Sequence, residues 1–316
     1  GVSLVADTGS PPAGSGTDKI TSNPALTVTS EAGSLVEYKV GGAAWSGTAP
    51  TGLPDGAQTV LVRQTDAVGN VSPTNTFSFT LDRSAAAPTV SLSNDTGAAD
   101  NITRDASLTV IGAEASAQVQ YSVASINGGA WSSTMPTLAD ATYTVKVKQT
   151  DPAGNVSADS ATITFTLDTS AAAPTVSLTN DTGVGGDNIT NNAAFTVGGK
   201  ETDATVQYST NGTSWSASYT ATAGSNTVFA RQTDVAGNVS AASAAYTFTL
   251  DTTVAAPSLS LASDTGSSSI DKLTNVSVVN VTGLEAGASW KYYNGSAWIN
   301  GTGNTFTISN DPADNV

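Results

Sequence analysis

Pairs of aspartates in short loops of small residues recur along the chain, and they are the groups best placed to do chemistry. The clearest copy reads NDTGAADNIT and carries Asp95 and Asp100. Similar stretches, ADTGSPPAGSGTDKIT, NDTGVGGDNIT and SDTGSSSIDKLT, begin at residues 6, 180 and 263. The chain has no His and no Cys, which excludes catalysis by those nucleophiles and the usual zinc sites. Carboxylate, amide and backbone oxygens favour calcium, and favour magnesium less because of its tight octahedral shell.

Three other acidic features recur in the same order as these loops. TDAVGNVS, TDPAGNVS and TDVAGNVS each hold an aspartate, and NDPADNV at the end of the sequence is a degenerate fourth copy. FTLDRSAAAP, FTLDTSAAAP and FTLDTTVAAP each hold an aspartate before an Ala-Pro linker, and a glutamate follows the second expected strand of each unit. This order predicts four tandem domains, here called repeats 1 to 4. Their expected boundaries are 1–84, 85–170, 171–253 and 254–316, with the start of the first strand missing from repeat 1 and the final strand missing from repeat 4.

Each repeat reads as short β-strands separated by turns. Abundant Val and Thr, frequent Gly and Asn, and only 12% charged residues form an all-β composition. In repeat 2 we expect strands at PTVSLS, SLTVIG, VQYSV, AWSS, YTVKVKQT and SATITFTL. Asn-Gly pairs at 127–128, 211–212 and 294–295 suit hairpin turns with positive φ. About seven strands in some 85 residues is typical of an immunoglobulin-like β-sandwich. Because the linkers are short, we expect four sandwiches stacked end to end as a rod.

The immunoglobulin-like topology would gather the acids where consecutive sandwiches meet. The A–B loop and the end of strand G lie at the base of a sandwich, whereas the B–C and F–G loops lie at its top. Junction 1, between repeats 1 and 2, would join Asp7, Asp18 and Asp82 to Glu114, Asp151 and Asn155. Junction 2 would join Asp95, Asp100 and Asp168 to Glu201 and Asp234. Junction 3 would join Asp181, Asp187 and Asp251 to Glu285 and Asp311. Glu31 and Asp66 at the top of repeat 1, and Asp264 and Asp271 at the base of repeat 4, complete the expected metal ligands.

The charge of the chain is concentrated at these recurring positions. They hold 19 of the 26 acids, and the other acids are outnumbered by the 11 Lys and Arg, within a net charge of −15. Close carboxylates repel by about 4 kcal/mol per pair at an effective dielectric constant near 20. The sequence therefore predicts calcium ions that neutralise the junctions and fix their angles. The alternative is that DTG and DxxGN only form Asx turns, with Gly supplying positive φ. A turn alone does not explain why both acids persist while the loop between them varies in length.

Several functions conflict with the composition. The acidic balance argues against nucleic acid as a partner, and no run of 18 apolar residues could insert into a membrane. No GxSxG motif accompanies the many serines. Paired carboxylates could suggest a glycosidase, but their repetition at the poles of every unit offers no cleft. We therefore expect a monomeric, non-catalytic protein.

One tryptophan per repeat follows a Gly-containing turn. Packing against or at the rim of the sandwich core is the structural interpretation of these side chains. The alternative function is a ligand- or glycan-binding adhesin module with an exposed Trp platform. Repeat 4 would be the best candidate for it, because Trp290 adds a second tryptophan there. The four recurring residues are Trp45, Trp131, Trp215 and Trp298.

The stretch LDTSAAAPTVSLTNDTG…DNIT…TDVAGNVS resembles the bacterial immunoglobulin-like (BIg) repeats of giant adhesins exported by type I secretion. Such repeats occur in the giant non-fimbrial adhesin of Salmonella and in large biofilm-associated adhesins. The resemblance covers the whole chain. It implies a secreted or cell-surface spacer with calcium at or near the domain junctions and no catalytic activity. Its implied partners are neighbouring repeats of the same chain and, through the full-length adhesin, host-cell or surface glycans.

Overall fold

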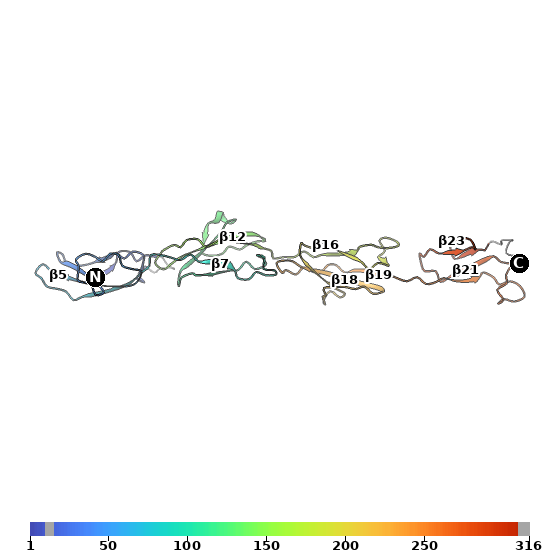
Figure 1. Ribbon diagram of the computed structural model, residues 1–316, viewed down its shortest axis with the longest axis horizontal. Coiled ribbons are helices and arrows are strands. Elements are labelled where there is room, and N and C mark those ends of the chain that lie inside the picture. The colour runs from blue at the N-terminus through green and yellow to red at the C-terminus, as the bar shows by residue number, and fades with distance from the viewer. Residues whose placement is uncertain (10–15, 309–316) are drawn as a thin grey trace. The chain divides into compact units, whose positions relative to one another are not determined.

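Short β-strands provide nearly all the regular structure of the computed structural model, which describes residues 1–9 and 16–308 (Figure 1). The one helical element among them is a single 3-10 turn, Asn127–Gly129. No helix in the described part is long and apolar enough to cross a membrane. The chain forms two compact units, Gly1–Val176 with Val197–Ser218 and Phe229–Ala244, and Ser177–Thr196 with Tyr219–Val228 and Ala245–Val316.

Repeat 1 consists of a two-stranded and a four-stranded sheet. The first pairs β1 (Val2–Leu4) with β3 (Leu26–Val28). The second has the order β2 (Ile20–Thr21), β6 (Asn75–Leu81), β5 (Gly56–Thr65) and β4 (Leu35–Val40). The pairs are antiparallel except β2 with β6, which is parallel. The alternation NTFSFTL in β6 turns Phe77, Phe79 and Leu81 into the core, because successive strand residues face opposite sides.

Repeat 2 keeps this plan and adds an edge strand. Its two-stranded sheet pairs β7 (Thr89–Leu92) with β9 (Leu108–Ile111). Its second sheet has the order β11 (Trp131–Ser132), β10 (Gln118–Val123), β12 (Ala141–Thr150), β13 (Ile163–Leu167) and β8 (Ile102–Thr103). Val145, Phe165 and Leu167 are buried between the sheets. These seven strands include all six predicted from the sequence, so the immunoglobulin-like fold is confirmed.

Repeat 3 has the same strand order. It pairs β14 (Thr175–Leu178) with β16 (Phe195–Gly198), and its second sheet has the order β15 (Ile189–Thr190), β19 (Tyr246–Leu250), β18 (Gly224–Thr233) and β17 (Thr205–Ser209). Again the short A–B strand β15 runs parallel to the last strand, β19. Val228 and Phe248 are buried in its core.

The acids that follow the last two strands of repeat 2 lie at opposite ends of the sandwich. In repeat 2, the first residue of β12, Ala141, pairs with the last residue of β13, Leu167. Asp168, which follows β13, therefore lies at the base, whereas Asp151, which follows β12, lies at the top. Ten residues of extended chain separate these ends by roughly 30 Å. One sandwich therefore cannot bring its own two acids together.

Repeat 4 departs from the prediction in its last described strand. Its sheets have the orders β20 (Ser258–Leu261), β21 (Val278–Thr282), β24 (Thr305–Thr307), and β22 (Lys291–Tyr293), β23 (Trp298–Asn300). NDPADNV is the degenerate copy of the motif that in repeats 1 to 3 follows the long strand, β5, β12 or β18, and each long strand lies between two neighbours of its sheet. β24, which precedes it, instead pairs with β21, the second strand of its repeat.

The pattern of apolar residues explains this difference. The strand before TDPAGN buries Val145 and Val147, the sixth and fourth residues before Asp151. The corresponding residues before NDPADNV are Thr305 and Thr307, whereas the apolar residue between them, Phe306, stacks on Tyr292 with ring centroids 4.3 Å apart. A shift of one residue exchanges the two faces of a strand. The strand therefore takes a different place in the fold.

Candidate metal centre at the domain junctions

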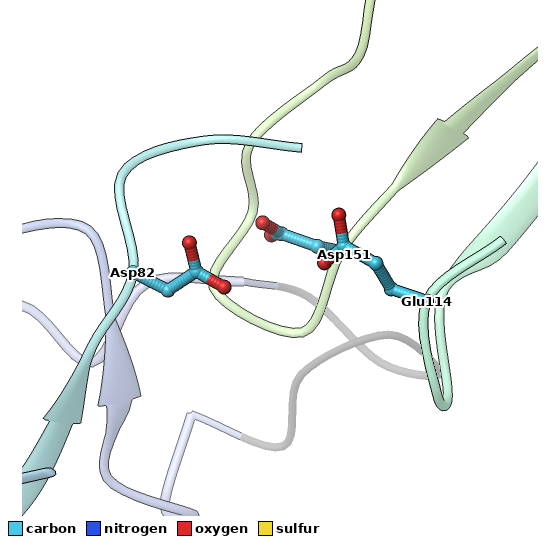
Figure 2. Close-up of side chains that lie close together, drawn as sticks. All are labelled: Asp82, Glu114 and Asp151. Carbon is cyan, nitrogen blue, oxygen red and sulfur yellow. The ribbon is translucent and has the colours of Figure 1, made fainter. Parts of the chain in front are cut away.

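Three carboxylates from two repeats meet at junction 1. Asp82 follows β6 of repeat 1, Glu114 lies between β9 and β10 of repeat 2, and Asp151 follows β12. Each offers one oxygen, and these atoms lie within 4.8 Å of one another. Figure 2 shows the three side chains converging from separate segments. Nowhere else in residues 1–9 and 16–308 do three such ligand atoms approach this closely.

Asn155 ties the two repeats together at this point. Its backbone N–H and its side-chain Nδ2 donate to the two oxygens of Asp151 at 2.8 and 2.7 Å. The same Nδ2 donates to the backbone carbonyl of Asp82 at 2.9 Å. Asp151 itself is fully buried. The predicted role of Asn155 at the junction therefore includes holding Asp151 in place.

No basic side chain neutralises this group among the described residues. Their ion pairs join Arg63 to Glu37, Arg83 to Asp55 and Lys146 to Asp159. One oxygen of Glu114 accepts the N–H of the linker residue Ala86 at 3.0 Å. Burial without a counter-charge is costly for carboxylates, so a cation would stabilise this arrangement.

Junction 2 repeats the same hydrogen bonds in different residues. Asn238 Nδ2 donates to the carbonyl of Asp168 and to Asp234, both at 2.8 Å. Glu201 accepts the N–H of Ala172 at 2.7 Å. These three carboxylates are not as close together as those of junction 1. At junction 3, Glu285 accepts the N–H of Ala255 at 2.8 Å, Asp251 follows β19, and Asp311 lies outside the described residues.

The paired aspartates of the A–B loops form a separate arrangement and do not join the junction 1 cluster. In repeat 2, Asp95 Oδ2 accepts the N–H of Asn101, and Asp100 Oδ1 accepts the N–H of Ile102, both at 2.9 Å. Asn101 has a positive φ of 65°. The predicted turn chemistry is therefore present. Equivalent bonds are made by Asp7 and Asp18, by Asp181 and Asp187, and by Asp264 and Asp271.

In each A–B loop, one carboxylate oxygen takes no part in the hydrogen bonds of the turn. Oδ1 of the first aspartate is buried and has no hydrogen-bond partner. Within the described part of the chain, these are the buried side-chain oxygens or nitrogens without a partner. Such a group in a native structure calls for an unseen water or ion. The four residues are Asp7, Asp95, Asp181 and Asp264.

The TDAVGN loop at the top of repeat 1 is held by hydrogen bonds within the loop. Asp66 Oδ1 accepts the N–H groups of Val68 and Asn70, and its Oδ2 accepts Asn70 Nδ2 at 2.8 Å. Glu31, at the same end, donates its N–H to Gln64 Oε1 at 3.0 Å. The bonds from the Asn70 side chain and backbone hold the pKa of the Asp66 carboxyl below its ordinary value.

We expect Asn70→Ala to raise the pKa of Asp66 toward that of a free aspartate, because the largest cause of the shift is removed. The depressed pKa stabilises the loop above the unfolded-state pKa, and this contribution is lost as pH falls through the folded-state pKa. Carboxyl chemical shifts followed by NMR through an acid titration would measure both values. The parent chain serves as the reference, and an unchanged Asp66 midpoint in the variant would contradict the assignment.

Several residues that sequence reasoning missed make direct contacts across the junctions. Thr8 Oγ1 donates to the carbonyl of Ala153 at 2.5 Å, and Thr96 Oγ1 donates to that of Ala236 at 2.6 Å. Arg104 adds a bond to the carbonyl of Gly237 at 2.8 Å. The recurrence of this threonine beside the aspartate in every DTG motif could have indicated its role.

The recurring tryptophans of repeats 1 to 3 carry a cation over their rings. Arg63 lies 4.2 Å from the ring centroid of Trp45, and Lys148 and Arg231 lie 4.4 Å from those of Trp131 and Trp215. All three cations come from the long strands β5, β12 and β18.

Repeat 4 differs because no third strand lies beside β22 and β23 among the described residues. Trp298 is accordingly 68% exposed, with Tyr293 beside it. Trp290 contacts Tyr292 and Phe306. The exposure of Trp298 thus follows from the missing cover and does not by itself indicate a ligand site.

Comparison with known families agrees with this architecture. Residues 84–169 match the bacterial Ig-like domain. This stretch is repeat 2, which holds Glu114 and Asp151 at its top and Asp95 and Asp168 at its base. The bacterial Ig-like resemblance is thus confirmed there by the family model. No curated protein matches the sequence.

Three solved structures share low overall similarity with the chain. Fibronectin(III)-like modules of CbhA from Clostridium thermocellum are 18% identical, with 53% of this chain and 94% of that chain covered and a TM-score of 0.28. A tetra-tandem repeat from the extending region of a large adhesion protein is 20% identical, with 81% and 75% covered and a TM-score of 0.26. A 1.5-MDa bacterial ice-binding adhesin is 21% identical, with 72% and 88% covered and a TM-score of 0.27. Scores this low carry no argument about function.

Proposed function

We propose that this chain is a non-catalytic structural spacer of a bacterial cell-surface adhesin, made rigid by calcium ions at its domain junctions. The observation that carries the proposal is the convergence of Asp82, Glu114 and Asp151 from two consecutive repeats without a basic partner. A structural module needs its neighbours held at fixed angles, and a shared cation does this by replacing carboxylate repulsion with attraction to both sides.

The geometry favours two kinds of calcium site. The junction site would use the carboxylates of Asp82, Glu114 and Asp151. The loop site would use the unpartnered Oδ1 of the first aspartate in each A–B loop, as in Asp95. Both offer oxygen ligands only, on loops whose spacing varies, and calcium accepts such irregular shells more readily than magnesium does.

Calcium sites in extracellular modules bind in the range of about 10⁻⁴–10⁻³ M. Ions at that affinity would occupy the chain outside the cell and leave it largely metal-free inside. The spacer would then stiffen after export, which suits a secreted or cell-surface location and type I secretion. Glycan or host-cell contacts would belong to another part of the full-length adhesin.

Calorimetric titration with calcium tests this function and separates the two kinds of site. We expect saturable binding at millimolar calcium or below, with Asp82→Asn removing the junction 1 site and Asp95→Asn removing one loop site. Asp159→Asn, which alters a surface acid paired with Lys146, should leave the number of ions unchanged. A chain that binds no calcium at 10 mM, about tenfold above the expected range, would rule out the metal-dependent spacer.

A further inference from the structure

One alanine in each of the first two linkers is held by the following repeat through both of its backbone groups. In junction 1 the N–H of Ala86 donates to Glu114 Oε1 at 3.0 Å, and its carbonyl accepts Gln149 Nε2 at 2.6 Å. Ala86 itself lies outside any strand. Two side chains of repeat 2 thus satisfy the backbone N–H and carbonyl of this linker residue, as the backbone of a neighbouring strand would in a sheet.

Gln149 connects three segments that the metal site needs. It is fully buried, and its Oε1 accepts the backbone N–H of Glu114 at 2.7 Å. Its Nε2 is the group that holds the Ala86 carbonyl. The same side chain therefore fixes the linker and the backbone from which Glu114 reaches toward Asp82 and Asp151.

Junction 2 contains the same connections in different residues. Gln232 is fully buried, accepts the N–H of Glu201 at 2.8 Å and donates to the carbonyl of Ala172 at 2.7 Å. It also donates to the carbonyl of Gly199 at 3.1 Å. The bonds of Gln232 join neutral amide groups, and the bond from the Ala172 N–H to the Glu201 carboxylate joins two groups in direct contact. None of these bonds includes a cation.

Repeat 1 provides the same glutamine without a linker. Gln64 Oε1 accepts the N–H of Glu31 at 3.0 Å and the hydroxyl of Ser34 at 3.3 Å. Within the described residues, no linker alanine precedes repeat 1. Gln64 therefore shares the loop-holding bonds with Gln149, and among the described residues it contacts no linker alanine, so Gln64→Met serves as the control for Gln149→Met.

We infer that Gln149 and Gln232 are positioning residues that dock consecutive repeats before any calcium binds. Each glutamine and its neighbouring glutamate bind the linker alanine through its carbonyl and its N–H. These two bonds fix the path of the linker and so orient the repeat that follows it relative to the repeat before it. The inference rests on the proposed function for its second step, in which these bonds hold Glu114 so that its other oxygen can face the ion. Calcium then strengthens a junction whose geometry hydrogen bonds have already set.

The absence of cysteine allows this to be measured with two spin labels in the full chain. Thr74→Cys in repeat 1 and Ser133→Cys in repeat 2 lie on exposed positions. In EGTA, we expect one narrow distance distribution for the labelled parent and for Gln64→Met. Gln149→Met should broaden it, with the ratio of docked to undocked chains falling about tenfold to a hundredfold, because two buried groups lose their partners.

A linker variant and the addition of calcium test the same inference independently of the stability of repeat 2. Ala86→Pro removes the N–H of the exposed linker residue and fixes its φ without altering either core, so it should also broaden the distribution even if Gln149→Met unfolds repeat 2. Adding calcium should narrow the distribution of Gln149→Met only in part and with weaker apparent affinity. A narrow distance distribution in EGTA for both Gln149→Met and Ala86→Pro, or a broad one for the labelled parent, would overturn the inference that these hydrogen bonds dock the repeats. Broadening by Gln149→Met with no response of any chain to calcium would support that inference and contradict the calcium proposal.

Discussion

Gly97→Ala should undock repeat 3 from repeat 2. Gly97 belongs to the DTG loop at the base of repeat 2 and has a φ of +76°. A Cβ atom there would overlap the backbone carbonyl oxygen of Val235 and lie 2.9 Å from atoms of Ala236 and Gly237. These are backbone atoms of the next repeat, and they can give way only if the two loops separate.

The loss should be large because the same loop carries the hydrogen bonds of the junction. Separation breaks the bonds from Thr96 to Ala236 and from Arg104 to Gly237. At about 1 kcal/mol per bond, with the clash added, the docked population should fall at least about tenfold. Distance distributions between labels at Ser133→Cys and Ser214→Cys, on exposed positions of repeats 2 and 3, would report it.

Gly183 provides the matched control for this substitution. It is the glycine of the DTG motif in repeat 3, its φ is +85°, and a Cβ atom there would meet nothing within 4 Å. Gly183→Ala therefore carries the same backbone strain of about 1–2 kcal/mol without the clash. It should leave the distance between the labels unchanged. Equal effects of the two substitutions would show that strain alone matters and that the loop contact does not hold the junction.

Asp82→Asn should have opposite effects with and without calcium. At 4.8 Å, two carboxylates repel by roughly 1 to 4 kcal/mol between the limits of bulk water and a protein surface. Removing the charge in EGTA should therefore raise the ratio of docked to undocked chains at junction 1 by at least about fivefold, measured in the Gln149→Met background in which the junction is loosened. In millimolar calcium the same change removes a ligand, so the docked fraction should fall below that of the parent.

The backbone of Asp82 keeps its role in this variant, because Asn155 donates to its carbonyl and not to its side chain. The labels at Thr74→Cys and Ser133→Cys would measure both conditions. Asp159→Asn, at a surface ion pair of repeat 2, should change neither. An effect of Asp82→Asn with the same sign in EGTA and in calcium would contradict a shared ion at this site.

The β-sandwich fold, the strands of repeat 2 and the ends of that sandwich at which its acids lie were readable from the sequence. These features depend on local patterns, namely the alternation in NTFSFTL, the Asn-Gly turns and the motif order. Gly128, Gly212 and Gly295 all have positive φ, as those turns require. The convergence of Asp82, Glu114 and Asp151 followed from the topology once the sandwich was assumed.

Tertiary structure alone decided which groups share a site and which strand pairs with which. The sequence grouped Asp7 and Asp18 with Asp82, and the structure shows that each of these two aspartates accepts a backbone N–H of its own loop. It gave no reason to single out Gln149, whose partners Ala86 and Glu114 lie far along the chain. β24, the strand before NDPADNV, does not take the place of the long strand of repeats 1 to 3: it pairs with β21, and Phe306 packs against Tyr292. Local propensity fixes a strand or a turn, whereas contacts between distant segments depend on packing that no short stretch encodes.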